Sequence, residues 1–184
     1  MPYLIDDRVT VWHIPKSGGT WVYRALKAAG VNVELREPQH GTPAEMPELA
    51  SVGIQAVTIR QRREWYWSVY CHLRDQLNVH PDCPANGSAL WDRMGVAASH
   101  LDTFDDFFAR HQGQYTRALL EFTPPGKFFI LRTAYLSLDL IRMLDLAGIS
   151  GLSRYAIQHF PRQNVTRESG RFWIDPPWAG TEGN

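Results

Sequence analysis

The chain has 184 residues, of which 44% are hydrophobic and 21% are charged, and its formal net charge is zero. This composition is ordinary for a globular protein, and the length predicts a single domain over residues 1–184. Zero net charge gives no argument for a nucleic-acid or membrane-surface partner, and no stretch approaches the roughly 20 apolar residues of a membrane span. We therefore expect a cytoplasmic protein in which Cys71 and Cys83, which lack CxxC spacing, are free thiols.

Strands and helices are expected to alternate along the chain. Short apolar runs predict strands at residues 8–14, 31–35, 55–59 and 127–131. Helical spacing of apolar residues predicts helices at 20–29, 43–49, 62–77, 104–110, 115–122, 134–147 and 153–160. Residues 80–100 are rich in Pro, Gly, Asn and Asp and are expected to be irregular. This order predicts an α/β fold with a central parallel sheet covered on both faces.

The most informative segment is HIPKSGGTWV at residues 13–22, between the first predicted strand and the first predicted helix. Glycines let backbone N–H groups turn toward a ligand, and a helix start adds positive potential. A lysine charge and two hydroxyls complete an anion cradle suited to phosphate or sulfate (Lys16, Ser17, Gly18, Gly19 and Thr20). The alternative is a plain strand-to-helix turn carrying a surface lysine.

PKSGGTW resembles the 5'-phosphosulfate loop of sulfotransferases, and the HIPK form is similar to carbohydrate sulfotransferases and their bacterial relatives. It is not a Walker A sequence, because Lys16 precedes both glycines instead of following the second. The resemblance implies a P-loop-like three-layer sandwich. It also implies 3'-phosphoadenosine 5'-phosphosulfate (PAPS) as sulfuryl donor, adenosine 3',5'-bisphosphate (PAP) as product, and Trp21 beside the adenine. A core position is the alternative for Trp21.

A second anion site is predicted at the end of the third strand. Arg60 follows that strand and Ser68 lies on the next helix, so the two side chains could hold one phosphate from two sides. The segment resembles the 3'-phosphate motif of the same family, with Arg60, Arg63, Ser68 and Tyr70 at matching positions. The chain departs from that motif at 60–62, where RQR replaces R-[DN]-P. The later segment RESGRFW resembles a cofactor-binding loop of the family and implies that Arg167, and with it Arg171, contacts the 3'-phosphate; exposed arginines without a ligand are the alternative.

Transfer to a hydroxyl requires a base for the acceptor proton. The loop after the second predicted strand offers Glu37 and His40. Histidine has an ordinary pKa near neutrality, whereas a glutamate would need a raised pKa, so we favour His40 and keep Glu37 as the alternative. The other histidines lack partners at ligand spacing, and we predict no metal site.

These features together predict a sulfotransferase that moves a sulfuryl group from PAPS to a hydroxyl acceptor, with a carbohydrate among the acceptor classes, by in-line transfer without metal. The aromatic stretch from Trp65 to Trp91 is expected to wall a sugar or phenol site. One rival is a non-catalytic nucleotide-binding module, which would keep the loop and need no base. A second is a P-loop kinase, which holds magnesium with a strand-end acid, whereas two predicted strands lead into Arg60 and Arg132.

Overall fold

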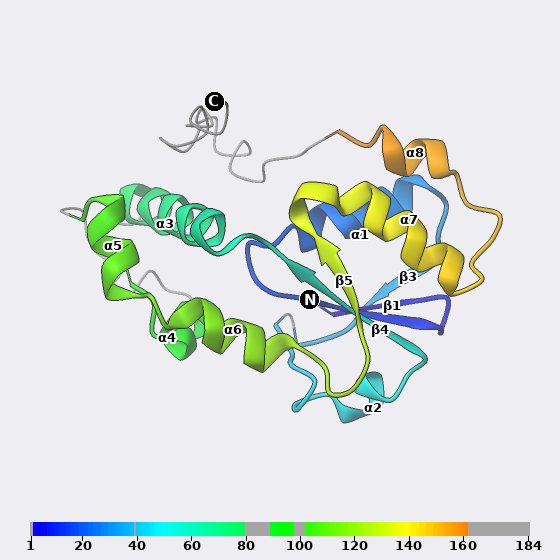
Figure 1. The fold of residues 1–184 in the computed structure, drawn as a ribbon, viewed down its shortest axis with the longest axis horizontal. Helices are drawn as coiled ribbons and strands as arrows, with labels where there is room; N and C mark the ends of the chain where they lie inside the picture. Colours follow the sequence, from blue (N-terminus) through cyan, green and yellow to red (C-terminus); the bar gives the residue numbers. More distant parts are fainter. Residues whose placement is uncertain (1, 39, 80–88, 98–101, 162–184) are drawn as a thin grey trace. The chain divides into compact units, whose positions relative to one another are not determined.

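The computed structural model describes residues 2–38, 40–79, 89–97 and 102–161 (Figure 1). The chain divides into two compact units, the first formed by residues 1–61 and 113–160 and the second by 62–112 and 161–184. The prediction of one domain over the whole chain stays a prediction. Three further expectations concern Cys83, Arg167 and Arg171, which lie outside the described residues.

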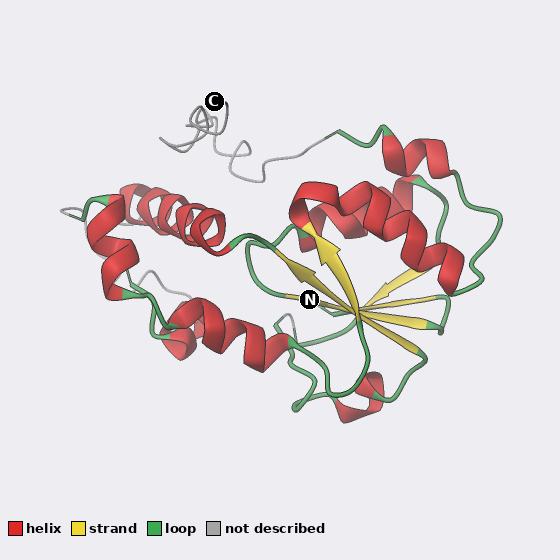
Figure 2. Cartoon of the chain, viewed as in Figure 1, coloured by secondary structure: helices red, strands yellow, loops and turns green. Residues whose placement is uncertain are grey.

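The first unit is built on a five-stranded sheet with the strand order β3-β1-β2-β4-β5 (Figure 2). The strands are β1 (Tyr3–Ile5), β2 (Val9–His13), β3 (Val33–Leu35), β4 (Ile54–Ile59) and β5 (Phe129–Arg132). β4 is parallel to β2 and to β5, whereas β1 is antiparallel to both β2 and β3. The predicted α/β class is confirmed, but the prediction of a parallel sheet is wrong because β1 makes the sheet mixed.

The sequence analysis missed β1, which forms a tight hairpin with β2. The Arg8 N–H donates to the Ile5 carbonyl at 2.9 Å, and Asp6 and Asp7 have φ angles of 46° and 54°. Positive φ at both central residues gives a turn whose twist matches that of the strands, and aspartate tolerates this conformation better than most residues. The pair Asp6-Asp7 therefore places β1 beside β2 in the middle of the sheet.

Helices α1 (Gly19–Ala28), α7 (Leu136–Leu146) and α8 (Arg154–Gln158) cover one face of this sheet (Figure 1). They bury a continuous core whose members include Val9, Val11, Val22, Leu26, Ala56, Leu131, Leu140 and Leu144. Toward the other face, the fully buried Trp12 donates from Nε1 to the Gln55 Oε1 at 2.7 Å. The predicted helix at 43–49 is shorter in the structure, where only α2 (Pro47–Ala50) is helical.

The sheet brings several loops to one edge. Because β1 is antiparallel to both of its neighbours, β2, β3, β4 and β5 all point the same way, and their carboxyl ends meet at that edge. The chain leaves β2 toward β3 on one side and leaves β4 toward β5 on the other. Ligands of open α/β sheets bind at such a change of direction, outside the carboxyl ends of the two strands. The fold therefore marks the ends of β2 and β4 as the place to look for a site.

The second unit is helical where it is described, with α3 (Arg62–Val79), α4 (Ala89–Met94) and α5 (Phe104–Arg110). α4 corrects the prediction that 80–100 is irregular throughout. The side chains of Trp65 and Trp91 are 0% and 2% exposed, so these two belong to the core of the unit. Trp67 and Tyr70 are half-buried, and an acceptor wall in this stretch stays a prediction. Large aromatic side chains contribute so much apolar area that burial commonly outweighs a surface role. No helix in the described ranges is long and apolar enough to cross a lipid bilayer.

Candidate anion-binding site

The turn between β2 and α1 has an unusual backbone. Lys16 and Gly18 have φ angles of 66° and 86°, and the Ser17 N–H donates to the Ile14 carbonyl at 3.0 Å. A left-handed conformation costs a residue with a Cβ about 1–2 kcal/mol, and such conformations cluster at functional sites. Left-handed residues within a tight turn also direct neighbouring N–H groups to one side, as in anion-binding nests. The segment 14–18 thus has two left-handed residues within one tight turn, and its binding of an anion stays a prediction.

The start of α1 is left open toward this turn. Its N-cap is Gly18, so no side chain caps the first turn, and no acidic residue occurs there. The first N–H groups of a helix have no intrahelical partner and carry the positive end of its dipole. Thr20 lies exposed in this first turn. The ten-residue α1 thus offers N–H donors and a hydroxyl next to Lys16 and Ser17.

The two glycines of the loop are required for different reasons. A Cβ at position 19 would lie 2.4 Å from the His13 ring, so the helix can approach β2 only with glycine there. At position 18 the backbone is left-handed, and a Cβ would lie 3.1 Å from Leu136 Cδ2. The Gly18-Gly19 pair is explained by close packing and by backbone conformation, which a plain surface turn would not need.

His13 connects this loop with the predicted base. Its ring stacks on Tyr3 with centroids 6.3 Å apart, and it lies 5.7 Å from the ring of His40. The Tyr3 hydroxyl donates to the Gly19 carbonyl at 2.7 Å, and burial raises the pKa of Tyr3 above its usual range, so this donor stays protonated. The structure thus brings His40 to the end of β2. Glu37 is exposed, and no contact found among the described residues joins it to the loop.

Arg60 follows β4 directly and is half-buried. Its carbonyl accepts a hydrogen bond from the Tyr115 hydroxyl of α6 (Gln114–Phe122). Thr133 Oγ1 lies 2.7 Å from the Ile59 carbonyl and 3.4 Å from the Ser17 carbonyl, which holds the loop against the end of β4. Ser68 is half-buried on α3 in the second unit, so its pairing with Arg60 around one phosphate stays a prediction.

Arg132, which ends β5, is engaged within the protein. Its Nε and Nη2 donate to Asp139 at 2.8 and 2.7 Å, and its backbone N–H donates to the same carboxylate at 3.0 Å. Burial by itself would raise the pKa of Asp139, but the hydrogen bonds and charge of Arg132, together with the charge of Arg142, hold that pKa below its ordinary value. The guanidinium of Arg132 is therefore engaged by Asp139, which ties the end of β5 to α7.

Trp21 is half-buried near the start of α1. Its ring meets Phe160 edge-on with centroids 5.8 Å apart and packs against the core of the first unit. The contact with Phe160 covers only part of the Trp21 ring, which is half-buried. Adenine stacking by Trp21 stays a prediction.

Comparison with models of known protein families, with curated proteins and with solved structures found no match. Within the described ranges, no group of three or more His, Cys, Asp or Glu side chains is placed to hold a metal ion. The site is therefore built from geometry alone.

Sequence reasoning missed two residues that organise this site. His13 was quoted only as part of the motif, although its position at the end of a buried strand could have marked it. Thr133 lies about 115 residues from the loop in sequence, and the bond that links it to Ile59 depends on the pairing of β4 with β5. No local pattern indicates a contact of that kind.

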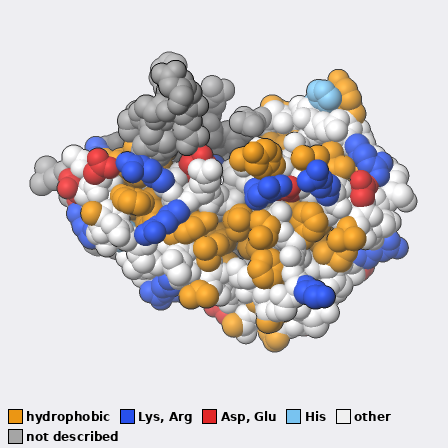
Figure 3. Space-filling view, in the orientation of Figure 1, with side chains coloured by type: hydrophobic (Ala, Val, Ile, Leu, Met, Phe, Trp, Pro, Cys, Tyr) orange, Lys and Arg blue, Asp and Glu red, His pale blue; other side chains and the backbone are white. Residues whose placement is uncertain are grey.

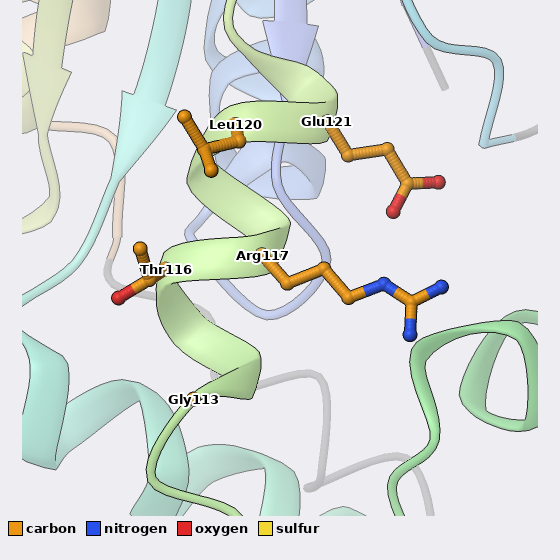
Figure 4. Close-up of a pocket in the computed structure, with 5 residues that line it drawn as sticks. All are labelled: Gly113, Thr116, Arg117, Leu120 and Glu121. Carbon is orange, nitrogen blue, oxygen red and sulfur yellow. The ribbon is translucent and has the colours of Figure 1, made fainter.

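A shallow hollow of about 590 Å³ lies along α6 and the residue before it (Figure 4). Its lining consists of Gly113, Thr116, Arg117, Leu120 and Glu121, none of which belongs to the loop or to its neighbours. Leu120 of this helix is one of the exposed large apolar side chains of the first unit. Figure 3 shows apolar side chains gathered on the face in view. A hollow on one helix has no converging polar groups of the kind that orient a ligand, so we place the candidate site at the loop.

Proposed function

We propose that the protein is a sulfotransferase that moves a sulfuryl group from PAPS to a hydroxyl acceptor, without a metal ion and on a P-loop-like three-layer sandwich. The observation that carries the proposal is the loop 14–20, in which left-handed Lys16 and Gly18 precede an uncapped helix start at a change of strand direction. An acceptor-side histidine stands next to it, since the rings of His13 and His40 are 5.7 Å apart.

The residues present fit the phosphosulfate end of this donor. Ser17 is fully buried, and its Oγ has no hydrogen-bond partner among the described residues. A buried hydroxyl without a partner costs about 1–3 kcal/mol, a cost that a bound oxyanion would remove. Ser17, Thr20 and the N–H groups of the helix start would hold the anion, with Lys16 supplying charge. The donor itself supplies an activated sulfuryl group.

Each residue then has a separate task. Lys16 stabilises the negative charge that develops on the leaving phosphate, which matters more in the transition state than in the bound ground state. His40 accepts the proton of the acceptor hydroxyl as that oxygen forms its bond to sulfur, and the sulfur–oxygen bond to the phosphate breaks. Arg60, with Ser68, Arg167 and Trp21, is proposed to bind the 3'-phosphate and the adenine. PAP then leaves as the product.

The non-catalytic module is the alternative function. It would share the loop and the binding of nucleotide, and the structure favours catalysis over it only through the position of His40 beside His13. The kinase alternative requires an acidic side chain at the end of a strand to hold magnesium. Near the end of β4, the register partner of His13 is Thr58, which is not an acid, and this counts against the kinase.

Calorimetry of PAP binding with and without magnesium, followed by an acceptor screen with sulfur-labelled donor, tests the proposal. We expect PAP to bind equally well in both conditions and label to reach a hydroxyl compound. Strict magnesium dependence would favour the kinase, and metal-independent binding without turnover on any acceptor would favour the module.

A further inference from the structure

Two hydroxyls of the first unit are buried and have no hydrogen-bond partner among the described residues. They are Ser17 Oγ in the loop and Thr58 Oγ1 near the end of β4, and both side chains are 0% exposed. Buried hydroxyls in folded proteins almost always have a partner, so each exception calls for an explanation by water or ligand. Thr58 has no role in the site as predicted from the sequence.

The sheet places Thr58 beside the loop. Thr58 is the register partner of His13 in the parallel β2–β4 pair, so the two side chains lie on the same face. On that face the His13 ring packs against Gly19, at the start of α1. Thr133 draws the Ser17 carbonyl to the carbonyl of Ile59, the residue next to Thr58. The face that carries Thr58 is therefore the face over which the loop and the helix start lie.

We propose that Thr58 is a further anion ligand, whose hydroxyl donates to an oxygen of the group held by the loop, together with the hydroxyl of Ser17. The chemical class of ligand is a phosphate or sulfate ester. The anion-binding role of Thr58 does not depend on the proposed function. The identity of the anion does: under the proposed function it is the phosphosulfate at the 5' end of PAPS.

The proposal has a consequence that a structural role would not share. Replacing a buried threonine that has no partner by valine removes an unsatisfied hydroxyl and keeps the shape, so the unliganded protein becomes more stable. The same change removes a donor from the bound anion. Thr58→Val should therefore raise the melting temperature of the unliganded protein by about 2–4 °C and weaken PAP binding about tenfold or more.

Thr10 provides a matched control on the neighbouring strand. It is also a fully buried threonine, but its hydroxyl donates to the Leu49 carbonyl at 3.0 Å. Thr10→Val should lower the melting temperature and leave PAP binding unchanged. Opposite shifts in melting temperature, together with weaker PAP binding in Thr58→Val alone, would support Thr58 as a ligand of the anion.

The experiment measures melting temperature without ligand, and PAP and pyrophosphate binding by calorimetry, for wild type, Thr58→Val, Thr10→Val and Ser17→Ala. Thr58→Val that binds both probes as tightly as wild type overturns the inference and leaves the sulfotransferase proposal standing. Wild type that binds pyrophosphate through Thr58 but not PAP supports the inference and counts against the proposed function. Binding of neither probe by wild type overturns both.

Discussion

Two regions at the same edge of the sheet treat their polar groups in opposite ways. At the end of β5, Arg132 and Asp139 satisfy each other with three hydrogen bonds, and the carboxylate side chain is only 3% exposed. At the ends of β2 and β4, the buried hydroxyls of Ser17 and Thr58 have no partner among the described residues, and Lys16 has a left-handed backbone. The first arrangement stabilises the fold, whereas the second costs stability. Such a cost is typical of groups that serve a ligand, so the contrast supports the proposed anion site.

Among the variants that test this contrast, His40→Ala should have the largest effect on turnover. Loss of the general base should lower turnover about 100-fold to 10,000-fold and leave PAP affinity unchanged, because His40 acts only on the acceptor. Turnover is measured with labelled donor and the acceptor found in the screen. Glu37→Ala is the matched variant from the same loop. If Glu37→Ala loses turnover and His40→Ala keeps it, Glu37 is the base.

Lys16→Ala should lower turnover about 100-fold, the usual cost of losing one preorganised charged donor. PAP affinity should fall less, because N–H groups and hydroxyls of the loop remain. Lys16→Gly should lose turnover to the same extent. Its free energy of unfolding should be about 1 kcal/mol higher than that of Lys16→Ala, because glycine adopts positive φ without strain. Equal stability of the two variants in urea would mean that Lys16 is not strained.

On the other side of the comparison, Asp139→Asn should lower the free energy of unfolding by about 2 kcal/mol and leave PAP binding intact. The figure lies below that for a fully buried pair because the Arg132 side chain is 49% exposed. Asp145 of the same helix pairs with Arg154 at the surface, where both side chains are about half exposed, so Asp145→Asn should change stability by less than about 0.5 kcal/mol. Urea unfolding of both variants measures the difference. PAP binding that weakens in Asp139→Asn would contradict the separation of the two regions.

The smallest effect is the acid dependence of that pair. The pKa of Asp139 is lower in the folded protein than its ordinary value of 3.8. Its contribution is therefore complete above about pH 4 and is lost as the pH falls through the lowered pKa of the folded state. The gap in unfolding free energy between wild type and Asp139→Asn should be constant from pH 7 to 5 and shrink below pH 4. A gap that widens on acidification would reverse the assigned direction of the pKa shift.

Sequence pattern was sufficient where a residue's role depends on its neighbours in the chain. The helix starts and strands around the loop follow from local spacing, and Gly18 follows from the left-handed backbone of the turn. β1 was not predicted, because a run of three apolar residues, Tyr3 to Ile5, is too short to show the periodicity that distinguishes a strand. The hydroxyl of Thr58 and the contact of Thr133 with the loop depend on register between strands, which no local window contains.

Burial assigns some of the aromatic residues to the core, which their types alone do not. Aromatic residues at 65–91 favour a ligand wall as much as a core, and the sequence alone does not distinguish them. In the structure Tyr66 and Phe107 are fully buried in the second unit with centroids 6.4 Å apart, like the neighbouring Trp65. The pairing of Arg132 with Asp139 was not predicted, because Asp139 follows seven residues later on α7 and meets Arg132 only after the chain turns back.

The position of β1 has a consequence for how the sheet assembles. The first two strands of the chain form a hairpin, and in the finished sheet they lie between later strands, with β3 beside β1 and β4 beside β2. A hairpin closes within about 1–10 μs because its contacts are local, whereas β3 and β4 can pair with it only after longer connections have closed. We expect the sheet to grow outward in both directions from residues 3–13. Deleting the first seven residues would then remove a central template, and β3 would lose the strand that joins it to the rest.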